Sequence, residues 1–279
     1  MRRAWGAALG AVGVLGVLAA IAMAQSPPPT VGVTASATSI AAQVTGPVAA
    51  GPTTFRITKA ASQKGLYVYV GLLNAGVSLD EFKAAMDRDD RREGDSSLGL
   101  TWVQASTFLA GDETTRDITL TLKPGQTYIL VSEPETDQGP PPTRGISTFT
   151  TSATANGATL AAPDATIRMV GRRFRGAASL PRSGVVRLTN EDGVPHFAIA
   201  FPLRRGVSNA RFGRVLRSGS ERAFGSIIAG EPVGVQPIMS GGNTSNDQQV
   251  SFPRAGRYGF VCFFDEHHEQ GMYRVITVR

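Results

Sequence analysis

The chain has 279 residues and a formal net charge of +6, with 32 glycines, 17 prolines, three histidines and one cysteine. This length allows one large or two modest domains, and the glycine and proline content favours a mostly β fold. A single cysteine excludes an internal disulfide, and the basic residues lack the aromatic interleaving and zinc-finger spacing of nucleic-acid-binding proteins.

The first residues have the pattern of an export signal. Arg2 and Arg3 precede a long apolar run, and residues 22–24 (AMA) fit a small-residue cleavage site. We therefore predict a signal peptide over residues 1–24 and an exported protein that is periplasmic, extracellular or associated with the cell envelope. Because the apolar run is long, an uncleaved membrane anchor is the alternative. Residues 25–30 are predicted to form a proline-rich linker.

Residues 31–155 contain short apolar runs bounded by turn residues, which predict a β-sandwich domain. One helix is expected within it, because Ser78 and Glu81 form a capping box. The charged stretch 87–97 and the proline-rich stretch 133–144 are predicted to be loops. The expected strands cover residues 31–37, 53–58, 66–73, 101–107, 117–122, 127–132 and 146–150.

Residues 160–279 repeat this plan at an offset of roughly 130 residues. Residues 55–58 (FRIT) resemble residues 186–189 (VRLT), and Tyr128 corresponds to Tyr258. An ordered repeat of this kind predicts two tandem domains of one fold, each with a short inserted helix.

The two predicted domains differ in charge. Residues 25–159 carry ten Lys and Arg against 13 acidic residues, whereas residues 160–279 carry 16 Arg against nine acidic residues. The arginine-rich half is suited to an acidic redox partner or an anionic envelope surface. An ordinary solvated face is the alternative interpretation of these arginines.

The only cysteine lies beside two of the three histidines. Tyr258, Phe260 and Cys262 alternate as they do on one face of a half-buried strand. A polar loop with His267 and His268 follows. The sequence thereby delivers a thiol and an imidazole to one loop.

A second imidazole and a thioether complete a ligand set. Met272 opens the next strand-like run, and His196 lies on an earlier one. Two imidazoles, a thiolate and a long axial methionine form a type 1 copper site, while methionine is a poor ligand for zinc. The first half has no histidine or cysteine, and Ser132 occupies the position equivalent to Cys262. The scaffold therefore does not need these side chains for packing.

Residues 160–279 resemble the cupredoxin family of blue copper proteins, which includes plastocyanin, azurin and auracyanin. Residues 190–201 (NEDGVPHFAIAF) and 256–272 (GRYGFVCFFDEHHEQGM) carry the resemblance. It implies an all-β protein of two tandem Greek-key sandwiches, the first (31–155) without metal ligands. The family spacing His-x-x-x-Gly-Met selects His267, with His268 as the alternate ligand. The implied ligands of one type 1 copper are His196, Cys262, His267 and Met272.

The resemblance implies one-electron transfer, a redox protein as partner and no enzymatic activity. Copper nitrite reductases and laccases resemble the two-domain layout, but a further copper centre needs more than the one histidine left over. A copper carrier or scavenger and a metal-free β-sandwich interaction module are the alternative functions. Phe260, Phe263 and Phe264 are expected to keep water away from the thiolate.

Overall fold

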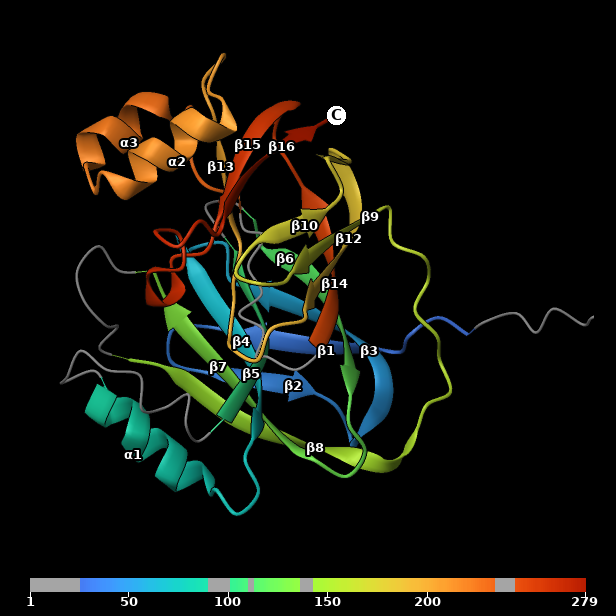
Figure 1. The fold of residues 1–279 in the computed structure, drawn as a ribbon. Coiled ribbons are helices and arrows are strands. Elements are labelled where there is room, and N and C mark those ends of the chain that lie inside the picture. The colour runs from blue at the N-terminus through green and yellow to red at the C-terminus, as the bar shows by residue number, and fades with distance from the viewer. Residues whose placement is uncertain (1–25, 90–100, 110–112, 136–142, 234–243) are drawn as a thin grey trace, which may run out of the picture.

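The computed structural model describes residues 26–89, 101–109, 113–135, 143–233 and 244–279. The predicted signal peptide and most of the two predicted loops, 87–97 and 133–144, lie outside these ranges. Within them the regular structure is mostly β, with short helices at its edges (Figure 1). The predicted all-β fold with inserted helices is confirmed. No helix of the described part is long and apolar enough to span a membrane.

The first half of the chain forms two layers around one core of buried apolar side chains, which includes Phe55, Leu66 and Leu130. One layer contains β1 (Thr30–Ala35), β2 (Ile40–Gln43), β3 (Val48–Lys59) and β6 (Thr115–Leu122), and the other contains β4 (Leu66–Leu73), β5 (Thr101–Leu109), β7 (Thr127–Pro134) and β8 (Gly145–Ala155).

The second half has the same construction around its own core, which includes Ile167, Leu188 and Phe260. One layer contains β9 (Ala165–Met169), β10 (Phe174–Gly176), β12 (Ser183–Asn190) and β14 (Thr244–Ser251), and the other contains β11 (Ser179–Leu180), β13 (Ile199–Pro202), β15 (Gly256–Val261) and β16 (Tyr273–Val278). The predicted domain boundaries, 31–155 and 160–279, stay predictions.

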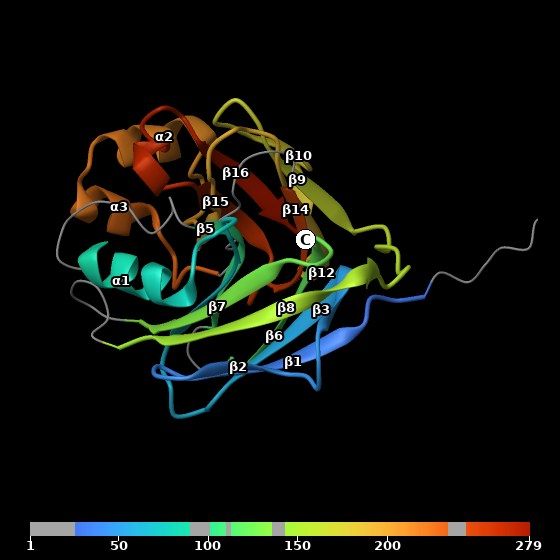
Figure 2. The same ribbon diagram turned by 90° about the horizontal axis from the view of Figure 1, so that it is seen from below.

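The two halves pair their strands in the same way. In the first, β1 runs parallel to β3 and β3 antiparallel to β6; in the second, β9 runs parallel to β12 and β12 antiparallel to β14. The halves meet where β6 pairs with β14, with Ile118 opposite Gln248. This pairing joins one layer of each half into a single sheet, in which β12, β14, β6 and β3 follow one another as neighbours (Figure 2).

Helices follow β4 in the first half and β13 in the second half. In α1 (Leu79–Asp89), the Ser78 N–H donates to the Glu81 carboxylate at 2.8 Å and the Glu81 N–H donates to the Ser78 hydroxyl at 3.2 Å. The predicted capping box is therefore confirmed, although the helix continues to Asp89 and includes the first three residues of the predicted loop. In α2 (Asn209–Arg217) the Ser208 hydroxyl accepts from the Arg211 N–H, and α3 (Glu221–Ile227) follows.

Several strand boundaries differ from the predicted ones. β2 was not predicted, and β3 begins at Val48 rather than at residue 53. The early start of β3 was missed because Gly51 and Pro52 interrupt the alternation of apolar and polar residues. Gly51 has φ +88°, so the strand bends there and its first residues turn to pair with β8.

Two ion pairs of the same geometry differ in burial, and we expect them to contribute differently to stability. Arg187 contacts Asp247 with two hydrogen bonds of 2.7 and 2.8 Å, and their side chains are 25% and 6% exposed. Arg56 contacts Asp117 in the same way, but these side chains are 57% and 30% exposed. We expect Arg187→Met to lower the free energy of unfolding by about 2 kcal/mol, because it leaves a buried carboxylate without its partner.

The control is Arg56→Met, whose expected cost is smaller because water replaces the lost partner at this exposed position. Chemical denaturation of the full chain measures both. Equal losses for the two variants would contradict this assignment of the buried pair.

Candidate metal centre

Three buried side chains from two distant segments meet at one point. The Nδ1 atoms of His196 and His267 are 3.0 Å apart, and Cys262 Sγ lies 3.6 Å from His267 Nδ1. The ligand atoms of all three lie within 4.8 Å of one another. Two atoms that each bind a metal at about 2.0–2.3 Å are at most about 4.6 Å apart, so both measured distances fit a shared ion.

β15 delivers the cysteine to this point. Tyr258, Phe260 and Cys262 are fully buried in the core between the two layers, as the alternation predicts. The prediction that the strand is half-buried is wrong, because Gly259 and Val261 are buried as well. The face of β15 that carries Gly259 and Val261 packs against α2 and α3. An alternating sequence pattern does not reveal helices that pack there.

The loop after β15 turns the imidazole of His267 inward. Two main-chain hydrogen bonds close it: the Cys262 N–H donates to the Met272 carbonyl at 3.1 Å, and the Met272 N–H donates to the His267 carbonyl at 2.9 Å. Asp265 and Glu266 have φ of +43° and +53°, the left-handed conformation of a tight turn. Met272 is fully buried in the same core cluster as Cys262.

The adjacent histidine lies outside this group. The ring of His268 packs edge-on against Phe263 at a centroid distance of 5.1 Å. Phe263 is 37% exposed and contacts Phe201, so the prediction that it shields the thiolate is wrong. Phe260 and Phe264 do pack in the core that contains the cysteine.

A carboxylate that we did not predict orients the first imidazole. Asp192 lies 2.7 Å from His196 Nε2 and accepts hydrogen bonds from the backbone N–H groups of Gly171 and Arg172 at 2.7 and 2.9 Å. The carboxylate therefore places the imidazole proton on Nε2 and leaves the Nδ1 lone pair directed towards His267.

The turn before His196 is fixed by its own side chains. Asn190 accepts from the Asp192 N–H at 3.0 Å and donates to the Val194 carbonyl at 2.8 Å. The sequence contains a local signal for this network. Asp192 lies four residues before the candidate ligand His196, in a turn that begins at Asn190, so its carboxylate can contact the imidazole.

Burial controls the protonation of all three candidate ligands. It raises the pKa of Cys262 to about 11, against the opposing hydrogen bonds from the Phe197 and Phe264 N–H groups, and it lowers the pKa of His196 and of His267. Burial alone would raise the pKa of Asp192, but its hydrogen-bond donors, Arg172 first among them, hold it below the usual range. At neutral pH the imidazoles are thus ready to bind a metal, which must displace the thiol proton.

The donor set fits copper. A thiolate is a soft ligand, imidazole suits copper in both oxidation states, and the thioether of Met272 is buried in the same core cluster as Cys262. His196, Cys262 and His267 would hold the ion, and Met272 is the candidate fourth ligand. The assignment of all four as ligands stays a prediction.

We expect Asp192→Asn to weaken copper binding by about 10- to 100-fold, because the amide no longer fixes the tautomer of His196. Competition against a Cu(I) chelator measures the change. Glu191→Gln is the matched control, since Glu191 pairs with Arg168 on the surface. Equal affinities of the two variants would exclude this role of Asp192, provided that both unfold at the same denaturant concentration without metal.

Comparisons with known proteins find distant matches among solved structures. No protein-family model matches the sequence, and a search of curated proteins gives no match. Among solved structures, auracyanin B is 21% identical over 43% of this chain and 93% of its own, with a TM-score of 0.27. An auracyanin from Roseiflexus castenholzii is 17% identical over 41% and 94%, with a TM-score of 0.28.

Longer copper proteins match more of the chain. A copper-containing nitrite reductase from Thermus scotoductus is 12% identical and covers 92% of this chain and 68% of its own, with a TM-score of 0.25. Identities and scores this low establish no family. The chain is distantly similar to auracyanins and to a copper-containing nitrite reductase.

Proposed function

We propose that this chain transfers single electrons through one mononuclear type 1 copper, held by His196, Cys262 and His267 with Met272 as the long axial ligand. The observation that carries the proposal is the convergence of three buried donor atoms within 4.8 Å. When bound, the ion supplies a reversible Cu(II)/Cu(I) couple.

The residues around the ligands are suited to this role. The Phe197 N–H donates to Cys262 Sγ at 3.5 Å, a hydrogen bond that stabilises negative charge on sulfur and tunes the potential. Phe260 and Phe264 limit the access of water. The Asp192 carboxylate and the closed ligand loop hold the donors in place, so that a change of oxidation state requires little movement.

Burial also bears on the alternative function. A copper carrier must hand over its ion through exposed ligands, yet Cys262 is 0% and His267 1% exposed. Electron transfer is therefore favoured over transport. With two of the three histidines in this centre, we further propose that the chain has no second copper centre and no enzymatic activity, and that its partner is an exported redox protein.

The test is copper loading of the full chain. We expect one copper per chain, intense visible absorption from the thiolate–copper bond, and bleaching and return of the colour on reduction and reoxidation. A colourless protein without stoichiometric copper would refute the proposal. Rapid loss of Cu(I) to a chelator would favour the carrier.

A further inference from the structure

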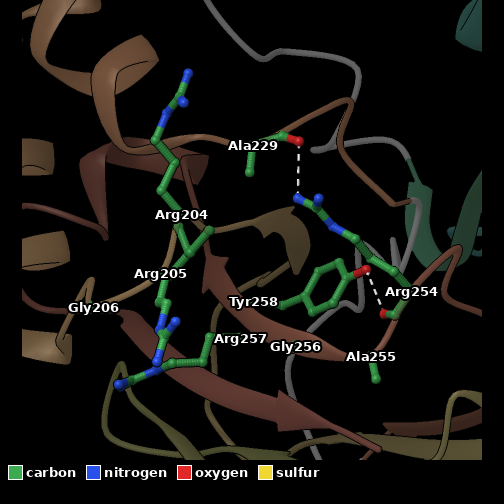
Figure 3. A pocket seen from close by; sticks show the side chains of 10 residues that line it. Arg204, Arg205, Gly206, Ala229, Arg254, Ala255, Gly256, Arg257 and Tyr258 are labelled. Atoms are coloured by element: carbon green, nitrogen blue, oxygen red, sulfur yellow. Dashed lines mark hydrogen bonds between the residues drawn. The ribbon is translucent and has the colours of Figure 1, made fainter.

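A hollow lined by arginines lies at the opposite end of β13 and β15 from the metal centre. Its volume is about 640 Å³, and four of its ten lining residues are arginines (Figure 3). Arg204 and Arg205 follow β13, while Arg254 precedes β15 and Arg257 lies at its start. This volume is within the range of small-ligand pockets, roughly 300–1,000 Å³.

No described carboxylate neutralises these four guanidinium groups. All four residues are exposed, and within the described residues none of them forms an ion pair. Arg254 donates a hydrogen bond to the Ala229 carbonyl at 2.8 Å. Four like charges around one hollow repel one another, and an anion bound among them would relieve that repulsion.

The frame of the hollow is fixed by hydrogen bonds. The buried Tyr258 donates its hydroxyl proton to the Arg254 carbonyl at 3.0 Å, which holds the turn before β15. The Leu203 N–H donates to the Arg257 carbonyl and the Arg204 N–H to the Ile227 carbonyl, both at 2.9 Å. The guanidinium groups therefore extend from a rigid backbone, which reduces the entropy lost on binding.

The fold itself does not require Arg204 and Arg205. The matching turn of the first half also precedes a serine-capped helix, but it carries Asn74 and Ala75 at these two positions. As with the metal ligands, the second half has acquired chemistry that the shared scaffold does without.

We propose that this hollow binds a small multivalent oxyanion, a ligand with two or more phosphate or carboxylate groups. The guanidinium fork matches both groups in a bidentate manner. Arg205 and Arg257 end on one side of the hollow and Arg254 on the other, so a ligand with two anionic groups can engage both sides (Figure 3). Cys262 is five residues from Arg257, about 17 Å along the strand, so the site does not depend on copper.

Isothermal titration of the full chain with pyrophosphate and with citrate tests the proposal. No copper is added, because both probes chelate it. We expect one saturable site for at least one probe, and the preferred probe identifies the phosphate or the carboxylate class. The double variant Arg205→Gln/Arg257→Gln should weaken binding by about tenfold or more. The matched control, Arg211→Gln/Arg222→Gln, removes the same charge from exposed helix positions and should leave the affinity unchanged.

Two results would overturn the proposal. One is the absence of saturable binding of either probe in dilute buffer. If a poly-glutamate peptide binds and neither small probe does, the proposal of a small ligand is likewise overturned. The other is an equal loss of affinity in the two double variants, which would show that net charge alone attracts the anion. Neither result bears on the copper centre, whose test is separate.

Discussion

Cys262→Ser abolishes the intense visible absorption expected of the copper-loaded protein. That absorption requires a thiolate bound to copper, and a serine hydroxyl is a hard ligand that does not ionise under these conditions. Loss of the only soft anionic ligand should also lower Cu(I) affinity by more than about a hundredfold, beyond the effect of any residue that acts through a ligand. Absorption spectra and competition with a Cu(I) chelator measure both effects.

The metal-free protein should tolerate this change. Serine is slightly smaller than cysteine and can still accept the hydrogen bond from the Phe197 N–H, so the free energy of unfolding should fall by no more than about 1–2 kcal/mol. Loss of colour is then a loss of ligand rather than of fold. Retention of the full absorption by Cys262→Ser would exclude a thiolate-bound copper.

The neighbouring histidines provide an internal control. His267→Ala should remove the colour, because its Nδ1 lies 3.0 Å from that of His196. His268→Ala should retain it, because that ring packs on Phe263 outside the group. The opposite result for the two variants would transfer the ligand role to His268.

The proximity of Cys262 and Met272 could be predicted from the sequence because each of them lies next to a strand. Cys262 follows an alternating run, and Met272 precedes another, so pairing of the two strands brings both ends of the loop together. The role of Asp192 could be read only in part, because its spacing of four residues from His196 is local but the hydrogen bonds that fix its carboxylate are not. Its carboxylate is positioned by the backbone of Gly171 and Arg172, some twenty residues away, and no local pattern encodes that contact.

The fold shows the same division between local and distant effects. The cap at Ser78 was predictable because both of its partners lie within four residues. The position of α2 was not, because it depends on two glycines that bring the helix close to the sheet. A Cβ on Gly213 would overlap the Tyr273 side chain, and one on Gly259 would overlap the ring of Phe212. The sequence does not show that either glycine lies against an aromatic side chain.

Gly259→Ala should therefore lower the free energy of unfolding by about 3 kcal/mol, at the upper end of the usual cost of overpacking. The new Cβ would lie 2.7 Å from two ring atoms of Phe212, which is fully buried. The ring cannot yield easily, since those of Phe224 and Tyr273 pack against it at 6.4 and 6.1 Å between centroids. Chemical denaturation of the metal-free chain measures the loss.

Two further variants separate this clash from a general effect of the added methyl group. Gly225→Ala places a methyl group in α3 with no atom within 4 Å, so it should stabilise the protein by up to about 1 kcal/mol through helix propensity. Phe212→Leu should relieve the overlap, and combined with Gly259→Ala it should cost less than the sum of the two single changes. If the costs simply add, the ring of Phe212 does not rest on Gly259, and the helix must be held on the sheet by its other contacts.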